Sequence, residues 1–337
     1  MIFLPIYAKI KSYDREDLLM SEKKNKNGMI VHPGELSRKW IDRLADAGIN
    51  TLGIHPEGGK DAPKSLERLL ELLETPEYRE LIDYARSRGL EVEYECHAAG
   101  YLMPRELFAS HPEYFRMNGA GERVADWNFC VSNEDALSFF AKRAASLALK
   151  LYGSSKNFYF WMDDGRGIHC QCPKCRSLSP SDQQYIALRA AFGEIKKYIS
   201  DARMAYLAYI DTIAPPTVAR SEDGLFLEYA PFEKYTAKGE DRAIRIERER
   251  GMIAPLLEYF GREEAKVLEY WYDNSLFSGW KKPPAHFTLN ADAMLADIRD
   301  YKALGFDRIS TFACFLGDDY EDLYGEVDVK PFGKAFK

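Results

Sequence analysis

The chain has 337 residues, with 46 Lys and Arg against 53 Asp and Glu, so its formal net charge is −7, and 46% of its residues are hydrophobic. This composition is typical of a soluble globular protein. The acidic balance and the lack of a Lys/Arg-rich block argue against binding to nucleic acid or to an anionic membrane, because both need concentrated positive charge.

The apolar runs of the sequence are all much shorter than the roughly 20 residues that cross a bilayer. The apolar N-terminal stretch 1–10 is short, lacks a basic lead and contains Pro5 and Lys9, so we predict no signal peptide. We expect a cytoplasmic protein if the chain is full length, and an exported one if a signal peptide has been removed ahead of it.

Eight apolar runs of strand length recur along the chain. Most are apolar nearly throughout, which is typical of strands buried on both faces of a parallel sheet. Amphipathic helical patterns lie between them, such as the one formed by Leu36, Trp40, Ile41 and Leu44. The predicted strands are 2–8, 51–55, 91–97, 158–162, 204–210, 225–230, 267–272 and 309–315.

Three junctions repeat one pattern, in which a glycine ends a helix just before a strand. The glycines are Gly48, Gly89 and Gly305. Eight strands joined by such units predict an α/β protein, a single closed (β/α)8 (TIM) barrel that fills one domain, residues 1–337. A doubly wound open sheet is the alternative, but it normally has fewer strands and a Gly-rich first turn, which the first run lacks.

The segment 98–134 interrupts the alternation of strands and helices. It is too polar and too rich in Gly and Pro to be a simple connecting helix. We therefore predict a long loop insertion over the C-terminal face of the barrel.

Polar residues that close the predicted strands are the first candidates for a site, because barrel enzymes carry their active sites at the C-terminal strand ends. Asp163 and Asp164 directly follow the fourth run and precede Gly165. Crowded carboxylates raise one another's pKa, as a general acid requires. The structural alternative is a turn or a helix cap.

Two further carboxylates, Glu228 and Glu269, lie among apolar and aromatic neighbours near the ends of the sixth and seventh runs. A buried charge needs a role or a partner, and a structural Arg is the plainer explanation. We interpret Asp164 as the general acid, Asp163 as its pKa modulator, Glu269 as base or nucleophile and Glu228 as a second carboxylate.

The same strand ends carry aromatic and polar residues that suit a sugar ligand, because aromatic faces stack on pyranose rings. A lone His at a strand end is as often structural. The predicted substrate-binding residues are His55, His97, Tyr101, Trp161, Tyr209, Asp211, Tyr229, Trp271 and Asp273.

Three of the six cysteines lie within six residues, and the spacing between Cys172 and Cys175 is that of a zinc knuckle. Cys170 and Cys130 could complete four thiolates around a structural zinc ion. An iron–sulfur cluster fits the spacing less well. Free thiols, or disulfides in an exported protein, are the alternatives, and no organic cofactor is expected.

Several short segments of the chain form an ordered set. They are 111–115, 121–123, 129–133, 163–165 with Cys170, Cys172 and Cys175, then 181–183 and 207–209. This set resembles the DUF4838 family, a group of barrel proteins near the α-glucuronidases and β-hexosaminidases. The resemblance implies a glycoside-hydrolase-like barrel, with an acid near the fourth strand and carboxylates such as Glu228 and Glu269 on later strands. The related hexosaminidases carry Asp-Glu where this chain has Asp163-Asp164.

These observations predict a glycoside hydrolase-like protein that acts on a carbohydrate, one that contains uronic acid or N-acetylhexosamine, by carboxylate acid/base catalysis. A barrel that binds carbohydrate without hydrolysis is the second hypothesis. A zinc-stabilised interaction protein is the third. The separation of the two carboxylates across the mouth distinguishes the first from the others.

Overall fold

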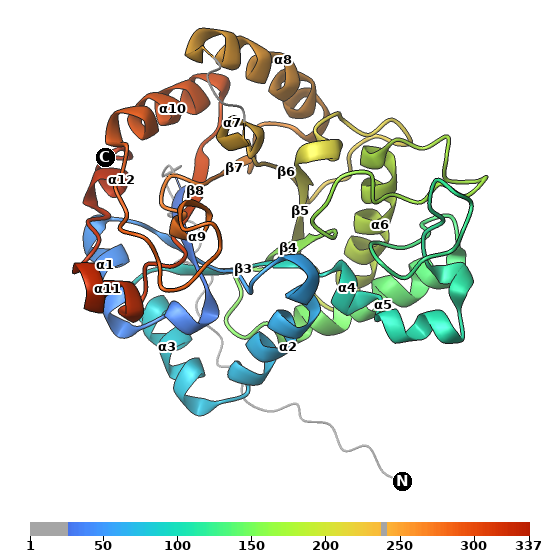
Figure 1. The fold of residues 1–337 in the computed structure, drawn as a ribbon, viewed down its shortest axis with the longest axis horizontal. Helices are drawn as coiled ribbons and strands as arrows, with labels where there is room; N and C mark the ends of the chain where they lie inside the picture. The colour runs from blue at the N-terminus through green and yellow to red at the C-terminus, as the bar shows by residue number, and fades with distance from the viewer. Residues whose placement is uncertain (1–25, 237–240) are drawn as a thin grey trace.

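The computed structural model describes residues 26–236 and 241–337, and its centre is a closed barrel of eight parallel strands (Figure 1). Each strand pairs in parallel with the next, and β8 pairs with β1 to close the ring. The predicted barrel is confirmed. The strands are β1 Lys26–Val31, β2 Thr51–Ile54, β3 Glu91–His97, β4 Asn157–Trp161, β5 Arg203–Ala208, β6 Leu225–Tyr229, β7 Lys266–Glu269 and β8 Arg308–Phe312.

The first strand was wrongly predicted. The barrel closes through Lys26–Val31, whereas the predicted segment 2–8 lies outside the described residues. The true strand has only the short apolar run Met29, Ile30 and Val31 after polar Asn27 and Gly28, so its composition is that of a loop. The other seven predicted runs each overlap an observed strand.

Helices cover the outside of the barrel (Figure 1). The connection between β5 and β6 is described throughout and contains only a 3-10 turn. No helix in the described ranges is long and apolar enough to cross a membrane. The α-helices are α1 Arg38–Ala47, α2 Ala62–Leu72, α3 Pro76–Ser87, α4 Ala99–Leu102, α5 Glu134–Lys150, α6 Pro180–Ile195, α7 Glu233–Thr236, α8 Arg242–Phe260, α9 Asn274–Phe277, α10 Ala291–Leu304, α11 Asp318–Tyr324 and α12 Lys330–Lys334, and the 3-10 turns are η1 Pro33–Glu35, η2 Gly59–Asp61, η3 Arg105–Ala109, η4 Pro112–Tyr114 and η5 Ile210–Thr212.

Glycine ends the helices at the predicted junctions. Gly48 follows α1 with φ of 79°, and Gly305 follows α10 with φ of 99°. Both donate their backbone N–H to carbonyls of the last helical turn. Because a side chain is strained in this left-handed conformation, glycine is the residue that lets the chain leave the helix and enter the next strand.

The insertion starts after β3 and ends at α5. Arg105 and Asn128, near its two ends, both contact Asp163 at the C-terminal end of β4. Much of the rest lies to one side of the barrel, beside α5 and α6 (Figure 1). The insertion therefore borders the C-terminal mouth through these two contacts.

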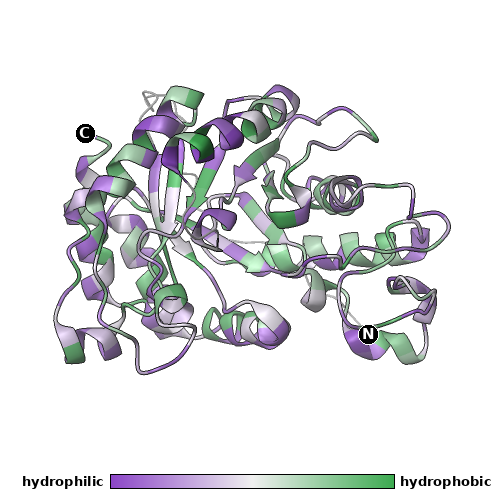
Figure 2. Cartoon of the chain, turned by 45° about the horizontal axis from the view of Figure 1, so that its top comes forward, coloured by the Kyte–Doolittle hydropathy of each residue, from purple (hydrophilic) through white to green (hydrophobic). Residues whose placement is uncertain are grey.

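Charged side chains fill part of the barrel interior, and hydrophilic segments interrupt the hydrophobic colour of the strands in Figure 2. The Lys266 ammonium lies 2.6 Å from Glu95, 3.2 Å from Glu228 and 3.4 Å from Glu93. Arg308 lies 2.7 Å from Glu93. All five side chains are buried, so their charges must compensate one another.

The protonation of this interior network follows from its charges. Burial would raise the pKa of Glu93, but Arg308 and Lys266 outweigh it and lower that pKa to about 2. Burial raises the pKa of Glu95 well above its usual value, and Glu228 and Glu93 raise it further. Burial also raises the pKa of Glu228. The raised pKa values of these two acids favour their neutral forms, which lowers the buried negative charge that Lys266 and Arg308 must balance.

Replacing Lys266 by Met should strongly destabilise the protein, because it leaves the carboxylates of Glu228 and Glu93 without this buried cation. Loss of one partner of a buried ion pair costs about 3–5 kcal/mol. Lys156→Met is the matched control, since Lys156 is exposed and pairs with Asp201 at the surface. It should cost less than about 1 kcal/mol. Urea unfolding measures both, and equal losses would contradict the role of Lys266.

Candidate functional site

Aromatic rings floor the C-terminal mouth of the barrel. Side chains alternate along a strand, so every second residue faces inward. The ring of Trp161, at the end of β4, lies 5.4 Å from His55, and Phe312, at the end of β8, lies 5.2 Å from His55 and 5.3 Å from Tyr270. These rings form one continuous aromatic cluster, and each of them keeps less than a tenth of its surface exposed.

Three histidines at the ends of the first three strands have the same bonding: His32 and His55 directly follow β1 and β2, and His97 is the last residue of β3. The Nδ1 atom of each contacts the backbone carbonyl of the neighbouring strand, at His55 (2.8 Å), Glu95 (2.6 Å) and Met162 (2.8 Å) respectively. Since a carbonyl only accepts, each Nδ1 carries a hydrogen, and in a neutral ring Nε2 is then an acceptor.

These histidines give the mouth hydrogen-bond acceptors. Burial lowers the pKa of His55 well below its usual value, and the neighbouring His32 and His97 lower it further, so His55 is neutral at physiological pH. The sequence had indicated His55 and His97. His32 was missed because the first strand was placed in the segment 2–8, and its signal was the same, a histidine directly after an apolar run.

Asp164 lies at this mouth together with two tyrosines. Burial raises the pKa of Tyr209, and both the charge of Asp164 and a hydrogen bond to it raise that pKa further. Burial also raises the pKa of Tyr270, followed by the effects of Tyr209, Asp273 and Asp164. Asp164 is half-buried, so it remains accessible beside the aromatic surface.

Asp163 has a different environment from Asp164. Its carboxylate pairs with Arg105 and accepts the backbone N–H of Asn128, while its own N–H donates to the Asn128 side chain at 3.0 Å. Its side chain is 7% exposed. Asp163 therefore connects the insertion to the end of β4.

Glu269 points away from the mouth. Lys266 on the same strand faces the interior, so the alternation turns Glu269 outward, toward α10. Its completely buried carboxylate pairs with Lys234 and accepts hydrogen bonds from Tyr301 at 2.6 Å and Tyr235 at 2.8 Å. The sequence had led us to expect Glu269 opposite Asp164 across the mouth. The structure does not bring the two carboxylates together there.

Glu228 faces the interior but lies beneath the mouth. It has no exposed surface, and it accepts a hydrogen bond of 2.8 Å from the Trp161 indole. Together with Lys266, it fixes the ring that floors the mouth. Its contacts are therefore those of a positioning residue.

Three of the predicted aromatic residues lie elsewhere or face outward. Trp271 donates to Asp297 at 3.3 Å and packs against Phe332, on the outer face of the barrel. Tyr229 follows inward-facing Glu228, so it also points outward. Tyr101, in α4, stacks with Arg143 of α5 at 5.1 Å. None of these three contacts the aromatic surface of the mouth.

The two remaining predicted carboxylates lie at the rim. Asp211 accepts the backbone N–H of Gly167 at 2.6 Å, and lines a small cavity of about 20 Å³ beside β4 and β5. Asp273 follows β7 and caps α9 by accepting the N–H groups of Ser275 and Leu276. Burial raises the pKa of Asp273.

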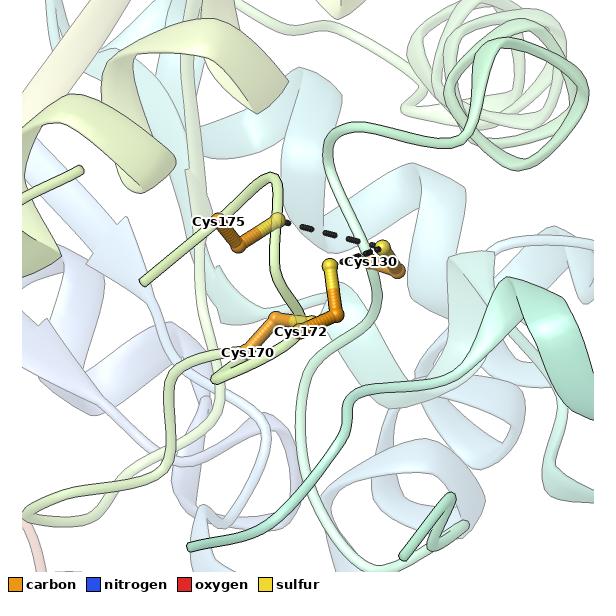
Figure 3. A group of neighbouring side chains, drawn as sticks. All are labelled: Cys130, Cys170, Cys172 and Cys175. Carbon is orange, nitrogen blue, oxygen red and sulfur yellow. Dashed lines mark hydrogen bonds between the residues drawn. The ribbon is translucent and has the colours of Figure 1, made fainter. Parts of the chain in front are cut away.

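Four buried cysteines converge on one point, as the sequence predicted, from two separate loops (Figure 3). Cys130 comes from the insertion, and Cys170, Cys172 and Cys175 come from the loop between β4 and α6. Their sulfur atoms all lie within 4.8 Å of one another, and the thiols are free. The group can therefore hold a metal ion.

Neighbouring residues form hydrogen bonds with the sulfur atoms and with the backbone of this cysteine cluster. The N–H of Met117 donates to the sulfur of Cys170 at 3.4 Å, and Ser132 lies 3.0 Å from the sulfur of Cys175. The Gln183 amide, at the start of α6, bonds to backbone atoms of Cys170 and Cys175. Donors around sulfur are typical of sites that hold thiolate ligands.

Glu269→Gln should lower the stability of the protein, because it removes the negative charge that faces buried Lys234. We expect the free energy of unfolding to fall by about 3 kcal/mol, the lower end of the range for a broken buried ion pair. The loss is limited because Asp297 still lies 3.0 Å from Lys234. Asp164→Asn keeps a hydrogen-bonding group beside Tyr209 and should cost less than about 1 kcal/mol. Denaturant unfolding compares the two, and a Glu269→Gln protein as stable as the parent would contradict this assignment.

Solved glycoside hydrolases share the fold. ZgEngAGH5_4, in complex with a cellotriose, matches with a TM-score of 0.51 and 9% identity over 90% of this chain and 88% of its own. Gan42B, a GH42 β-galactosidase, matches with a TM-score of 0.56 and 14% identity over 94% of this chain and 56% of its own. A β-galactosidase from the psychrophilic Marinomonas ef1 matches with a TM-score of 0.50 and 11% identity over 85% of this chain and 53% of its own. At such identities the likeness shows the fold alone, and this chain spans little more than half of the two β-galactosidases.

The family comparison covers half of the chain. No curated protein matches the sequence. The family described as Domain of unknown function (DUF4838) matches residues 71–244, which run from α2 into α8 and include Asp164 and the four clustered cysteines. The chain therefore belongs to the DUF4838 family.

Proposed function

We propose that this protein binds a carbohydrate at the C-terminal mouth of the barrel and hydrolyses a glycosidic bond there, with Asp164 as the general acid. The observation that carries the proposal is the position of Asp164, which is half-buried directly after β4, where its charge raises the pKa of both Tyr209 and Tyr270. The fold shared with glycoside hydrolases supports it.

The mouth has the three kinds of groups that sugar chemistry needs. Trp161, Phe312 and Tyr270 offer aromatic surface for a pyranose ring. The Nε2 atoms of neutral histidines such as His55 accept hydrogen bonds from hydroxyl groups. Asp164 supplies a proton to the leaving oxygen, and Tyr209 orients its carboxyl group.

Asp273 is our candidate for the second carboxylate, in place of Glu269. The charges of both Asp273 and Asp164 raise the pKa of Tyr270, so both carboxylates belong to the surroundings of that ring. Burial raises the pKa of Asp273, which strengthens its carboxylate as a base. A residue in this role would activate water or attack the sugar.

Asp164→Asn should lower kcat by about 100-fold or more while the Kd for sugar changes little, because the amide keeps the shape but cannot donate a catalytic proton. Aryl glycosides, including hexosaminides and glucuronides, serve as substrates, and calorimetry measures binding. Asp201→Asn, at an exposed site remote from the mouth, is the control.

The two functional hypotheses separate in this experiment. A hydrolysed glycoside whose turnover survives Asp164→Asn would contradict the role of Asp164. Sugars that bind without any hydrolysis would favour the barrel that binds carbohydrate without cleaving it.

We also propose that Cys130, Cys170, Cys172 and Cys175 hold one structural zinc ion. Four mutually close thiols suit the tetrahedral coordination that Zn²⁺ prefers, and four protein ligands leave no open position for chemistry. The ion would join the insertion to the loop between β4 and α6, which also carries Asp164 near its start. Its role would be to stabilise that loop.

Purified reduced protein should contain about one zinc per chain, with zinc–sulfur distances near 2.3 Å by X-ray absorption. Chelation should lower the Tm, because metal binding contributes to folding stability. Cys130→Ser should lose the metal, whereas Cys96→Ala, which alters a buried cysteine outside the cluster, should retain it. Metal-free fresh protein, or a disulfide among the four cysteines, would refute the zinc proposal.

A further inference from the structure

A cavity of about 520 Å³ opens beside the mouth, between the loops that follow β1, β2 and β8 and the side of α2. Its volume is within the range of small-ligand sites. His32 belongs both to this cavity and to the row of histidines at the mouth. The cavity is therefore a neighbour of the proposed sugar site, and no residue of its wall was predicted for that site.

One wall of the cavity is apolar. Pro33 and Pro56 come from the loops after β1 and β2, and Leu69 and Leu72 come from α2. A wall of this kind can pack against the carbon-bearing face of a sugar ring, but it offers no partner to a charged group.

The lining of the cavity also carries hydrogen-bonding groups of both kinds. Arg68 and Lys282 donate, while Glu57 and Asp318 accept. Hydroxyl groups both donate and accept, so a ring bearing several hydroxyls can satisfy such a mixture. Two further carboxylates, Glu35 and Asp319, line the cavity, and burial raises the pKa of Glu35. The other three acids still outnumber the two cationic side chains, Arg68 and Lys282, which disfavours an anionic ligand.

The backbone around the cavity is held in a special conformation. Glu35, which is 8% exposed, accepts the N–H of Phe315 at 2.8 Å and that of His32 at 3.3 Å. Phe315 has φ of 60°, which is uncommon for a residue with a side chain, and Lys282 lies 4.8 Å from its ring. Strained backbone that neighbouring groups fix in place is a feature that clusters at ligand sites.

A row of rings leads from the cavity to the proposed catalytic centre. His32 lies 5.8 Å from His55, which lies 5.4 Å from Trp161, on the strand that precedes Asp164. A ligand that contacts both Asp164 and the cavity must cross this row. It is therefore longer than a single sugar ring.

We infer that the cavity is a second sugar subsite, and that the ligand is a neutral oligosaccharide that extends from Asp164 across His55 to the apolar wall. This inference rests on the proposed carbohydrate function of the mouth. It adds the length and the charge of the ligand, which the mouth alone does not define.

Blocking the cavity without touching the mouth tests the inference. Gly34 lines the cavity, has no heavy atom within 4 Å of an added Cβ and does not require a left-handed conformation, so Gly34→Trp can fill the space. Gly193→Trp is the matched control, because Gly193 in α6 is equally free of neighbours. Circular dichroism and Tm confirm that both variants fold.

Calorimetry with mono- and trisaccharides of the gluco, galacto, xylo and N-acetylglucosamine series gives the readout. We expect a trisaccharide to bind the parent protein at least about tenfold more tightly than its monosaccharide, a difference of about 1.4 kcal/mol. Gly34→Trp should remove this advantage and leave monosaccharide binding unchanged, and Gly193→Trp should preserve both.

A trisaccharide that keeps its advantage in Gly34→Trp, or that never has one, would overturn the second subsite while the mouth remains a sugar site. Failure of every series to bind the parent protein would overturn the carbohydrate function of the mouth as well. Preference for glucuronic-acid trisaccharides over neutral ones would overturn the neutral character of the ligand.

Discussion

The buried charge of Lys266 is the constraint on which the interior of this barrel depends. A cation in a closed barrel is tolerated only with acids around it, and Glu93, Glu95 and Glu228 supply them from β3 and β6. Glu228 in turn holds the indole of Trp161. The ion network thereby sets the position of the ring that floors the mouth, so charge compensation in the interior and the shape of the proposed site are linked.

The loop between β4 and α6 is the second determinant of the site. Asp163 fixes its beginning to the insertion through Arg105 and Asn128, and the cysteine cluster joins its later part to the same insertion. Asp164 lies at the start of this loop. Two separate attachments therefore restrict how Asp164 can move, which is the kind of support that a positioned acid needs.

The sequence predicts the barrel well, because its signals are local. Apolar runs and glycines after helices, such as Gly48 and Gly305, depend only on neighbouring residues. It misses β1 because three apolar residues after Gly28 are too few for recognition. Convergence of Cys130 with Cys172 and Cys175 was predictable because thiol spacing carries chemistry of its own.

Side-chain direction at the strand ends was predicted less well. Where a strand is apolar on both faces, its sequence does not tell which residues face inward. Lys266 provides the missing register, because it fixes Tyr270 inward and Glu269 outward. The cavity beside His32 is lined by residues from several separate segments of the chain, so no single motif could indicate it.

A crystal structure of the protein with a bound oligosaccharide tests the central claim most directly, that the mouth around Asp164 is a carbohydrate site. The account predicts a sugar ring against Trp161 or Tyr270, with a glycosidic oxygen about 3 Å from the Asp164 carboxyl group. A sugar bound only outside the barrel mouth, with Asp164 still engaged by Tyr209 alone, would contradict it.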